Sequence, residues 1–328
     1  MNNWLKAGLT AAACLAGPAV AQADFPERAV TLVVAQPAGG PSDVFARIVA
    51  EKAGAILGQP VVVENRPGAN SMAAYVSMSN ARPDGYSVLL STSGANAFPA
   101  LFKSFTLDLG KDLTPVALLS SGPLAVFANP KTPFDTLDDL VAHAKAHPGE
   151  LNYANISAGS LLPAEMLKQA TGIDFVTVNY NGGAPSYQAV MTGEADFLLT
   201  TLGAGKPMVD SGQLKAISVN TAKRSDLAPD IPALGESKDP QIAAMAEFGG
   251  FAEVWFAIVG PKGLDPENAR ILGEAFRKAV EDPQVSEKIR SVSQMVPAPA
   301  DAAELGKRIE AEQAQWLEIA KTAGIMPQ

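Results

Sequence analysis

Residues 36–43, Gln-Pro-Ala-Gly-Gly-Pro-Ser-Asp, contain groups that can bind an anion. Gly39 and Gly40 permit a positive φ and a close approach of the backbone to a ligand. The first N–H groups of a helix that starts near Asp43 have no partner inside the helix and carry partial positive charge. Together these groups would form an anion site that needs no basic side chain. The alternative interpretation is a tight turn in which Asp43 only complements the helix dipole.

Four further loops contain the same kinds of residue, at 64–71, 91–96, 155–160 and 179–184. Each follows an expected strand, and Ser, Thr, Asn and Gly are also ordinary turn and cap residues. Backbone N–H groups and hydroxyls without a catalytic base are suited to hold a polar or anionic small molecule and leave it unchanged. Arg66 could pair with a ligand carboxylate or, equally, with its neighbour Glu64.

Residues for catalysis and metal binding are scarce. The chain has one Cys, Cys14, and two His, His143 and His147, whose spacing suits one face of a helix, but Ala-Lys-Ala between them supplies no carboxylate. We expect surface histidines, no metal, no cofactor and no catalytic residue. A pair of carboxylates acting as acid and base remains an alternative. The net charge of −9 makes nucleic acid a poor partner.

The elements that must position these loops are short β-branched runs alternating with helical patterns. Helices are expected at 43–57, 70–80, 137–146, 184–192, 204–211, 266–281 and 302–322, the second opened by an Asn or Ser cap. Strands are expected at 29–35, 61–64, 87–91, 124–128, 151–156, 175–178, 195–199, 214–219 and 253–259. This alternation predicts an α/β fold with parallel sheets.

Residues 1–23 have the pattern of a secretory signal, with Lys6, a small apolar run and Ala21-Gln22-Ala23. We expect cleavage after Ala23 and an exported protein. The apolar run is too short for a membrane anchor, and Ala11 is a poor match for lipidation at Cys14.

The residue pattern changes near 120–122 and again near 249–250, which predicts that the chain crosses twice between two lobes. Lobe I would comprise residues 24–124 plus 250–328, and lobe II would comprise residues 125–249. Hinges are expected at 120–126 and 247–253. Such a two-lobed fold has its ligand cleft between the lobes, where strand C-termini and helix N-termini meet.

Several motifs, above all GQPVVVENRPGA and ARPDGY, resemble those of the Bug-type solute receptors, the substrate-binding proteins of tripartite tricarboxylate transporters. The resemblance runs from about Phe25 to Ile325. It implies a two-lobed periplasmic-binding-protein-like fold. It also implies a periplasmic receptor, expected to be a monomer, that closes on a small carboxylate and docks on membrane permease subunits. The competing interpretations are a ligand-sensing subunit for a membrane signalling partner and an enzyme on a similar fold.

The predicted ligand-binding residues come from the loops and from the resemblance. They are Pro37, Gly39, Gly40, Asp43, Asn70, Ser71, Thr92, Asn96, Ser157, Gly159, Ser160, Tyr180 and Asp196. The chain departs from the family at Ala38, where a second proline is usual, in a shorter loop near Ser157, and at Ala233, where Thr is common. Leu161 replaces a usual His, which suggests a less charged or bulkier ligand than a tricarboxylate.

Overall fold

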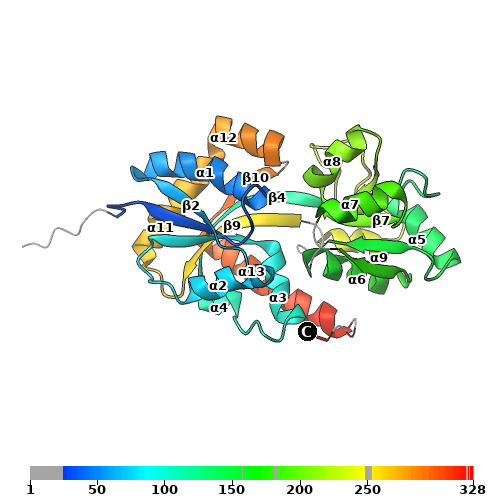
Figure 1. Ribbon diagram of the computed structural model, residues 1–328, viewed down its shortest axis with the longest axis horizontal. Helices are drawn as coiled ribbons and strands as arrows, with labels where there is room; N and C mark the ends of the chain where they lie inside the picture. The colour runs from blue at the N-terminus through cyan, green and yellow to red at the C-terminus, as the bar shows by residue number, and fades with distance from the viewer. Residues whose placement is uncertain are drawn as a thin grey trace, which may run out of the picture.

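One long strand, β4 (Leu113–Ala128), belongs to two sheets and joins two α/β lobes (Figure 1). The computed structural model describes residues 25–327 except 157, 181–182, 248–252, 294, 323 and 325. Up to Pro123, β4 pairs with β9 (Glu253–Pro261), and from Leu124 it pairs with β7 (Phe197–Thr201) and β8 (Lys215–Val219). This change of partner marks one crossing between the lobes. The predicted second crossing falls mainly on 248–252, and the predicted leader on 1–23, both outside the described residues.

The lobe I sheet has the order β2-β1-β3-β9-β4, with β10 also paired to β4. Its other strands are β1 (Val30–Val34), β2 (Val61–Asn65), β3 (Ser87–Thr92) and β10 (Val296–Ala300). Strands β1, β2 and β3 are parallel, whereas β9 runs antiparallel to both β3 and β4.

The period of two along β1 explains how this sheet is covered on both faces. Leu32 packs with α1 (Pro41–Leu57) and α11 (Pro266–Glu281), whereas Val33 packs with α2 (Met72–Ser79) and the first half of α13 (Ala302–Thr322). A sheet buried on both faces needs apolar residues at successive positions, as in Val-Thr-Leu-Val-Val of β1.

In lobe II, the end of β4 lies between β7 and β8, and β7 continues to β5 (Asn152–Asn155) and β6 (Val176–Asn179). Helices α5 (Leu137–Ala146), α6 (Ala158–Thr171) and α9 (Pro240–Ala244) pack on one core, and α7 (Gly183–Thr192) and α8 (Leu202–Asp210) pack on the other. Shorter helices are α3 (Phe98–Leu101), α4 (Leu109–Asp112) and α12 (Pro283–Lys288). No helix in the described part of the chain is both long and apolar enough to cross a membrane.

The structure corrects several predicted elements. Both sheets are mixed rather than parallel, because β4 and β9 run against their neighbours. Strand β4 starts at Leu113 rather than 124. Its register shifts beside Pro115, and a proline within an apolar run argues against a strand in the sequence. Strand β10 was not predicted because Pro297 and Pro299 interrupt it, which an edge strand tolerates.

The helix predicted to begin at Asn70 begins instead at Met72. A 3₁₀ turn, Ala69–Ser71, precedes it, and its three residues have positive φ values of 44°, 53° and 75°. Ser71 makes no side-chain cap. The predicted Ser thus occupies the N-cap position of α2 but makes no capping hydrogen bond, because the chain enters the helix through left-handed backbone.

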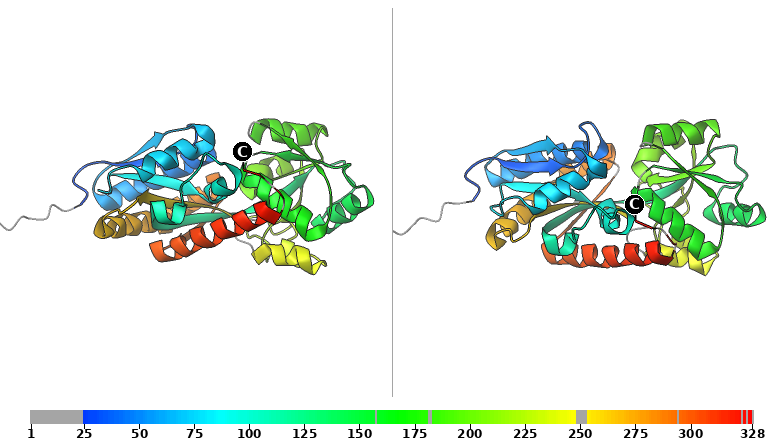
Figure 2. Two further views of the ribbon diagram at one scale, coloured as in Figure 1. Left: turned by 90° about the horizontal axis from the view of Figure 1, so that it is seen from below. Right: turned by 60° about the horizontal axis from the view of Figure 1, so that its bottom comes forward.

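Helix α13 contacts both lobes, although the prediction assigned its whole segment to lobe I (Figure 2). Leu305 and Ile309 lie in a lobe I core, whereas Trp316 and Ala320 pack with residues of lobe II. The Gln169 side chain of α6 also donates a hydrogen bond to the Ile319 carbonyl at 3.3 Å. The second half of α13 thus lies across the boundary between the lobes.

Candidate functional site

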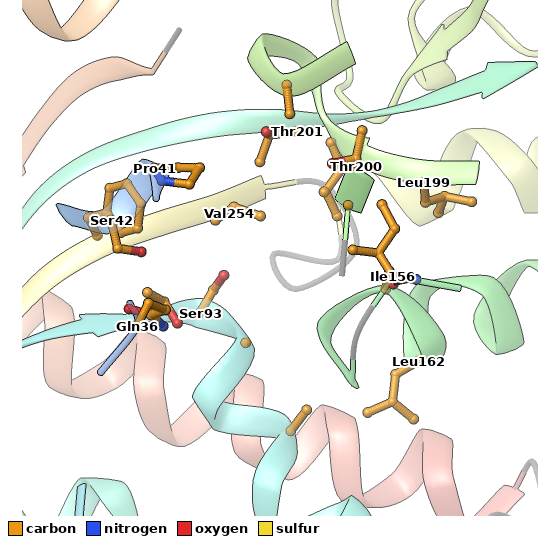
Figure 3. A pocket seen from close by; sticks show the side chains of 18 of the residues that line it. Gln36, Pro41, Ser42, Ser93, Ile156, Leu162, Leu199, Thr200, Thr201 and Val254 are labelled. Atoms are coloured by element: carbon orange, nitrogen blue, oxygen red, sulfur yellow. Dashed lines mark hydrogen bonds between the residues drawn. The ribbon is translucent and has the colours of Figure 1, made fainter. Parts of the chain in front are cut away.

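A cavity of about 520 Å³ lies between the two lobes (Figure 3). Its polar lining residues are Gln36, Ser42, Thr92, Ser93, Ser160, Tyr187, Thr200 and Thr201. Its apolar lining residues are Pro41, Ala97, Leu124, Ile156, Leu162, Leu199, Ala204, Val254, Phe256 and Trp316, with Gly94 and Gly183 completing the wall. Among the described residues, no lining side chain is ionisable at neutral pH.

Helix N-termini from both lobes border this cavity. Helix α1 begins after Gly40 and exposes Pro41 and Ser42 to it, while α8 begins after Thr201 and exposes Ala204. Neither Gly40 nor Thr201 provides a side-chain cap. The first-turn N–H groups therefore carry partial positive charge toward the cavity without a competing acceptor from the cap residue.

Asp43 holds the first loop together and does not line the cavity. Its carboxylate accepts the Gly39 N–H at 2.9 Å and forms a two-pronged ion pair with Arg47, with N–O distances of 3.0 and 2.9 Å. The Arg47 hydrogen bond, assisted by the Gly39 N–H, lowers the pKa of Asp43 from 3.8 to about 2, against the opposite effect of burial. Asp43 is only 4% exposed.

The ligand contacts predicted in this loop are neighbours in the chain of the residues that line the cavity. Pro37, Gly39, Gly40 and Asp43 do not line the cavity, because the turn at Gly39, with φ +82°, points its N–H back at Asp43. The lining residues are their neighbours Gln36, Pro41 and Ser42. Of the next loop, Asn70 is exposed and does not line the cavity, and Ser71 reaches it only through a 3.5 Å contact with the Gln36 amide.

In the loop after β3, Thr92 lines the cavity as predicted, and Ser93 joins it. Asn96 does not line it, because this side chain is 1% exposed and donates to Glu312 of α13 at 2.8 Å. Glu312 also accepts the Trp255 indole N–H at 2.9 Å and Arg308 at 2.9 Å. Burial raises the pKa of Glu312, and Arg308 opposes that rise. Asn96 therefore ties the loop to α13 and does not face the cavity.

In lobe II, Ser160 lines the cavity, and its hydroxyl donates to the Asn155 side chain at 2.8 Å. Ser157 lies outside the described residues, and Gly159 lies in the first turn of α6. Tyr180 and Asp196 do not line the cavity: Tyr180 donates to Glu194 at 3.0 Å, and Asp196 accepts the Asn152 N–H at 2.7 Å. Both side chains instead make hydrogen bonds within lobe II.

The substitution singled out in the sequence, Leu161, packs against the lobe II core, and it is Leu162 that lines the cavity. The sequence also missed Tyr187, Thr200 and Thr201, of which Tyr187 and Thr200 are joined by a 3.2 Å hydrogen bond. Thr200 and Thr201 end β7 just before α8, so the same strand-to-helix pattern used for the other loops could have identified them.

No group of three or more potential ligands among the described His, Cys, Asp and Glu residues could hold a metal ion. His143 and His147 stack on each other at the end of α5, with ring centroids 4.6 Å apart, and His147 lies 3.3 Å from Glu150.

A neutral cavity between two α/β lobes, bordered by helix N-termini from each, defines a two-lobed solute-binding protein. The chain belongs to the family described as the tripartite tricarboxylate transporter family receptor, whose sequence profile matches residues 45–325. Members of this family are periplasmic solute receptors. The predicted family, fold class and receptor function are thereby confirmed.

Individual relatives agree with this assignment. Protein BugT of Bordetella pertussis (strain Tohama I) is 32% identical over 281 residues, 84% of this chain and 83% of BugT. The structure of R. palustris Rpa4515 with adipate has a TM-score of 0.80 and 28% identity, covering 93% of this chain and 100% of that one. MatC from Rhodopseudomonas palustris, with bound malate, has a TM-score of 0.75 and 26% identity, covering 90% and 100%.

Proposed function

We propose that this protein captures a small organic acid in the cavity between its lobes and delivers it, chemically unchanged, to the permease subunits of a tripartite tricarboxylate-type transporter. The acid is held by backbone N–H groups and hydroxyls, and closure of the lobes about β4 removes water from it. The bound adipate and malate of the two relatives support an acid as the ligand.

The observation that carries this proposal is the meeting of α1 and α8 at one neutral cavity. Their first-turn N–H groups attract an anion from both lobes, so a carboxylate gains contacts as the lobes approach. The described lining residues include no His, Lys, Asp or Glu that could act as a base on the Ser and Thr hydroxyls there, which favours binding without turnover.

Thermal unfolding of residues 24–328, first unfolded and refolded to remove carried-over ligand, tests the proposal against a panel of mono-, di- and tricarboxylates. An acid present at 100 to 1,000 times its Kd adds about 2.7–4.1 kcal/mol to the free energy of unfolding. The acid must then be recovered intact by mass spectrometry. If no acid stabilises the protein, or if the bound acid is converted, the proposal fails.

A matched pair of variants locates the binding. Thr92→Val removes a hydroxyl that lines the cavity, whereas Thr31→Val makes the same change on β1, which does not line it. Loss of one hydrogen bond to a charged group should weaken binding by roughly 10-fold. We expect that loss for Thr92→Val alone, and equal losses in both variants would place the ligand elsewhere.

Export and partnership are part of the same proposal. The leader directs the chain to the periplasm, where the monomer meets the permease. N-terminal sequencing of the exported protein should begin at Asp24, and uptake of the bound acid by cells should require both this protein and the permease. A start at another residue would overturn the predicted cleavage after Ala23, and uptake that persists without this protein would overturn its role in delivery.

A further inference from the structure

Trp316 of α13 carries a hydrogen-bond donor that is buried and unpaired. Its side chain is 4% exposed, and its indole N–H is closed to water and has no hydrogen-bond partner in the part of the chain that the structure describes. Trp255 differs, because its indole N–H donates to Glu312 at 2.9 Å. A buried donor without an acceptor destabilises a protein, and nearly all such donors in native structures are paired. The Trp316 indole N–H therefore calls for an acceptor.

The side chains that pack around Trp316 at the cavity supply no such acceptor. Ala97, Leu162 and Leu199 line the cavity together with Trp316 and belong to the same apolar core. Their side chains are hydrocarbon, so they accept no hydrogen bond. Because Trp316 borders the cavity, a molecule that occupies this space is the source from which an acceptor can come.

The position of Trp316 on α13 makes its surroundings sensitive to movement of the lobes. Glu312, one helical turn earlier, is fixed to lobe I by hydrogen bonds from Asn96 and Trp255. Trp316 itself packs with Leu162 of lobe II, where the second half of α13 crosses the boundary between the lobes (Figure 2). A change in the angle between the lobes therefore alters the surroundings of the Trp316 indole more than those of Glu312.

Resting on the proposed function, we propose that Trp316 is a further binding residue, whose indole N–H donates a hydrogen bond to an oxygen of the bound acid when the lobes close. Helix α13 then contributes to binding alongside the loops of the two lobes. The unpaired N–H destabilises the open protein, and the acid removes that penalty on closure. The indole therefore favours the closed, ligand-bound form over the open one.

Nuclear magnetic resonance of residues 24–328 tests the contact directly, because this part of the sequence contains only two tryptophans, Trp255 and Trp316. The probes are adipate, malate and every acid of the panel above that stabilises the protein. We expect the Trp316 indole proton to move downfield and to show a nuclear Overhauser effect to the bound acid, and Trp255 to show neither. A bound acid without this effect at Trp316 would overturn the inference and leave the receptor proposal intact. Failure of every acid to bind would overturn both.

An isostere of tryptophan separates hydrogen bonding from packing. Benzothienylalanine has the shape of tryptophan with a sulfur atom in place of the N–H. Trp316→benzothienylalanine should not lower the Tm of the ligand-free protein, since no hydrogen bond is lost, but should weaken binding of the same acids by roughly 10-fold. Trp255→benzothienylalanine, the matched control, should lower the Tm because it removes a bond to Glu312. Equal losses of Tm at the two positions, or unchanged affinity in the position 316 variant, would contradict the proposal.

Discussion

At the scale of single residues, Asp43 shapes a loop at the cavity without lining the cavity itself. Its carboxylate fixes the Gly39 N–H and Arg47, and this leaves Pro41 and Ser42 at the cavity. The backbone groups that we propose bind the anion therefore have positions that depend on the buried carboxylate of Asp43.

We expect Asp43→Asn to lower the free energy of unfolding by about 1–2 kcal/mol at pH 7, an effect limited by the exposure of Arg47. The folded-state pKa of Asp43 is about 2 and its ordinary value is 3.8. The stabilisation is therefore present above about pH 4 and is lost as the pH falls toward 2. Urea unfolding of both proteins between pH 7 and pH 2.5 measures it. The control is Asp226→Asn, which changes an exposed acid. If the difference in the free energy of unfolding between the wild-type protein and Asp43→Asn does not shrink at low pH, the stabilisation does not come from the Asp43 carboxylate.

The chemistry of the site was more predictable from sequence than its individual residues. Gly, Ser and Thr after a strand indicate exposed donors, and two residues chosen by this pattern, Thr92 and Ser160, line the cavity. It could not separate residues that face the cavity from those that face their own turn. Asn96 and Asp43 have suitable polar side chains, but both are bonded to other residues. Asn96 donates a hydrogen bond to Glu312, which is distant in the chain, and Asp43 pairs with Arg47 on the next helical turn.

At the scale of elements, Glu312 joins three segments that are far apart in the chain. It accepts hydrogen bonds from the loop after β3, from Trp255 of β9 and from Arg308 of its own helix, and Arg308 extends the network to Glu253 at 3.1 Å. The loop at the cavity and strand β9 are thus held by one buried carboxylate. Such a network is costly to break because the remaining charge stays buried.

Glu312→Ala should lower the free energy of unfolding by about 3–5 kcal/mol, because it leaves Arg308 and Asn96 without their shared acceptor. Glu312→Gln should cost less, since an amide oxygen still accepts a hydrogen bond. The matched control is Glu310→Ala, an exposed position on the same helix, which should change stability by no more than about 0.5 kcal/mol. Denaturant unfolding compares the three, and equal costs at positions 310 and 312 would refute the role of the network.

Strand prediction succeeded where a strand is one continuous apolar run and failed where prolines interrupt it. Strands β1 and β3 match the pattern directly. The first part of β4 and all of β10 contain proline, and their pairing depends on neighbours contributed by distant parts of the chain. Local sequence carries no record of such pairing partners, which also explains why the antiparallel direction of β9 was missed.

At the scale of the whole molecule, Trp316 connects the lobes beside the cavity. It is 4% exposed, lines the cavity and packs with the lobe II core, although its helix begins in lobe I. Any movement of one lobe relative to the other must therefore either preserve the packing of Trp316 or let its contact surfaces slide past each other. The lobe assignment from sequence did not foresee this, because the apolar period of a helix does not reveal which core it enters.

We expect Trp316→Ala to lower the free energy of unfolding by about 3–5 kcal/mol through the cavity it leaves. It should also increase the radius of gyration of the ligand-free protein in small-angle X-ray scattering, since the lobes lose a shared contact. Trp316→Phe should retain most of the packing, and Leu317→Ala, 49% exposed at the next position, is the control. An unchanged radius of gyration for Trp316→Ala would indicate that α13 does not restrain the lobes.

The place of β9 also has a consequence for how the protein is made. Strand β9 fills the gap between β3 and β4, yet β3 ends at Thr92 and β9 begins only at Glu253. At 5–20 residues per second, a ribosome needs about 10–30 s to produce the missing strand after β3 has emerged. During that interval the facing edges of β3 and β4 have no partner and can recruit other chains. A chaperone that binds extended polypeptide therefore has a defined window in which to protect the nascent protein.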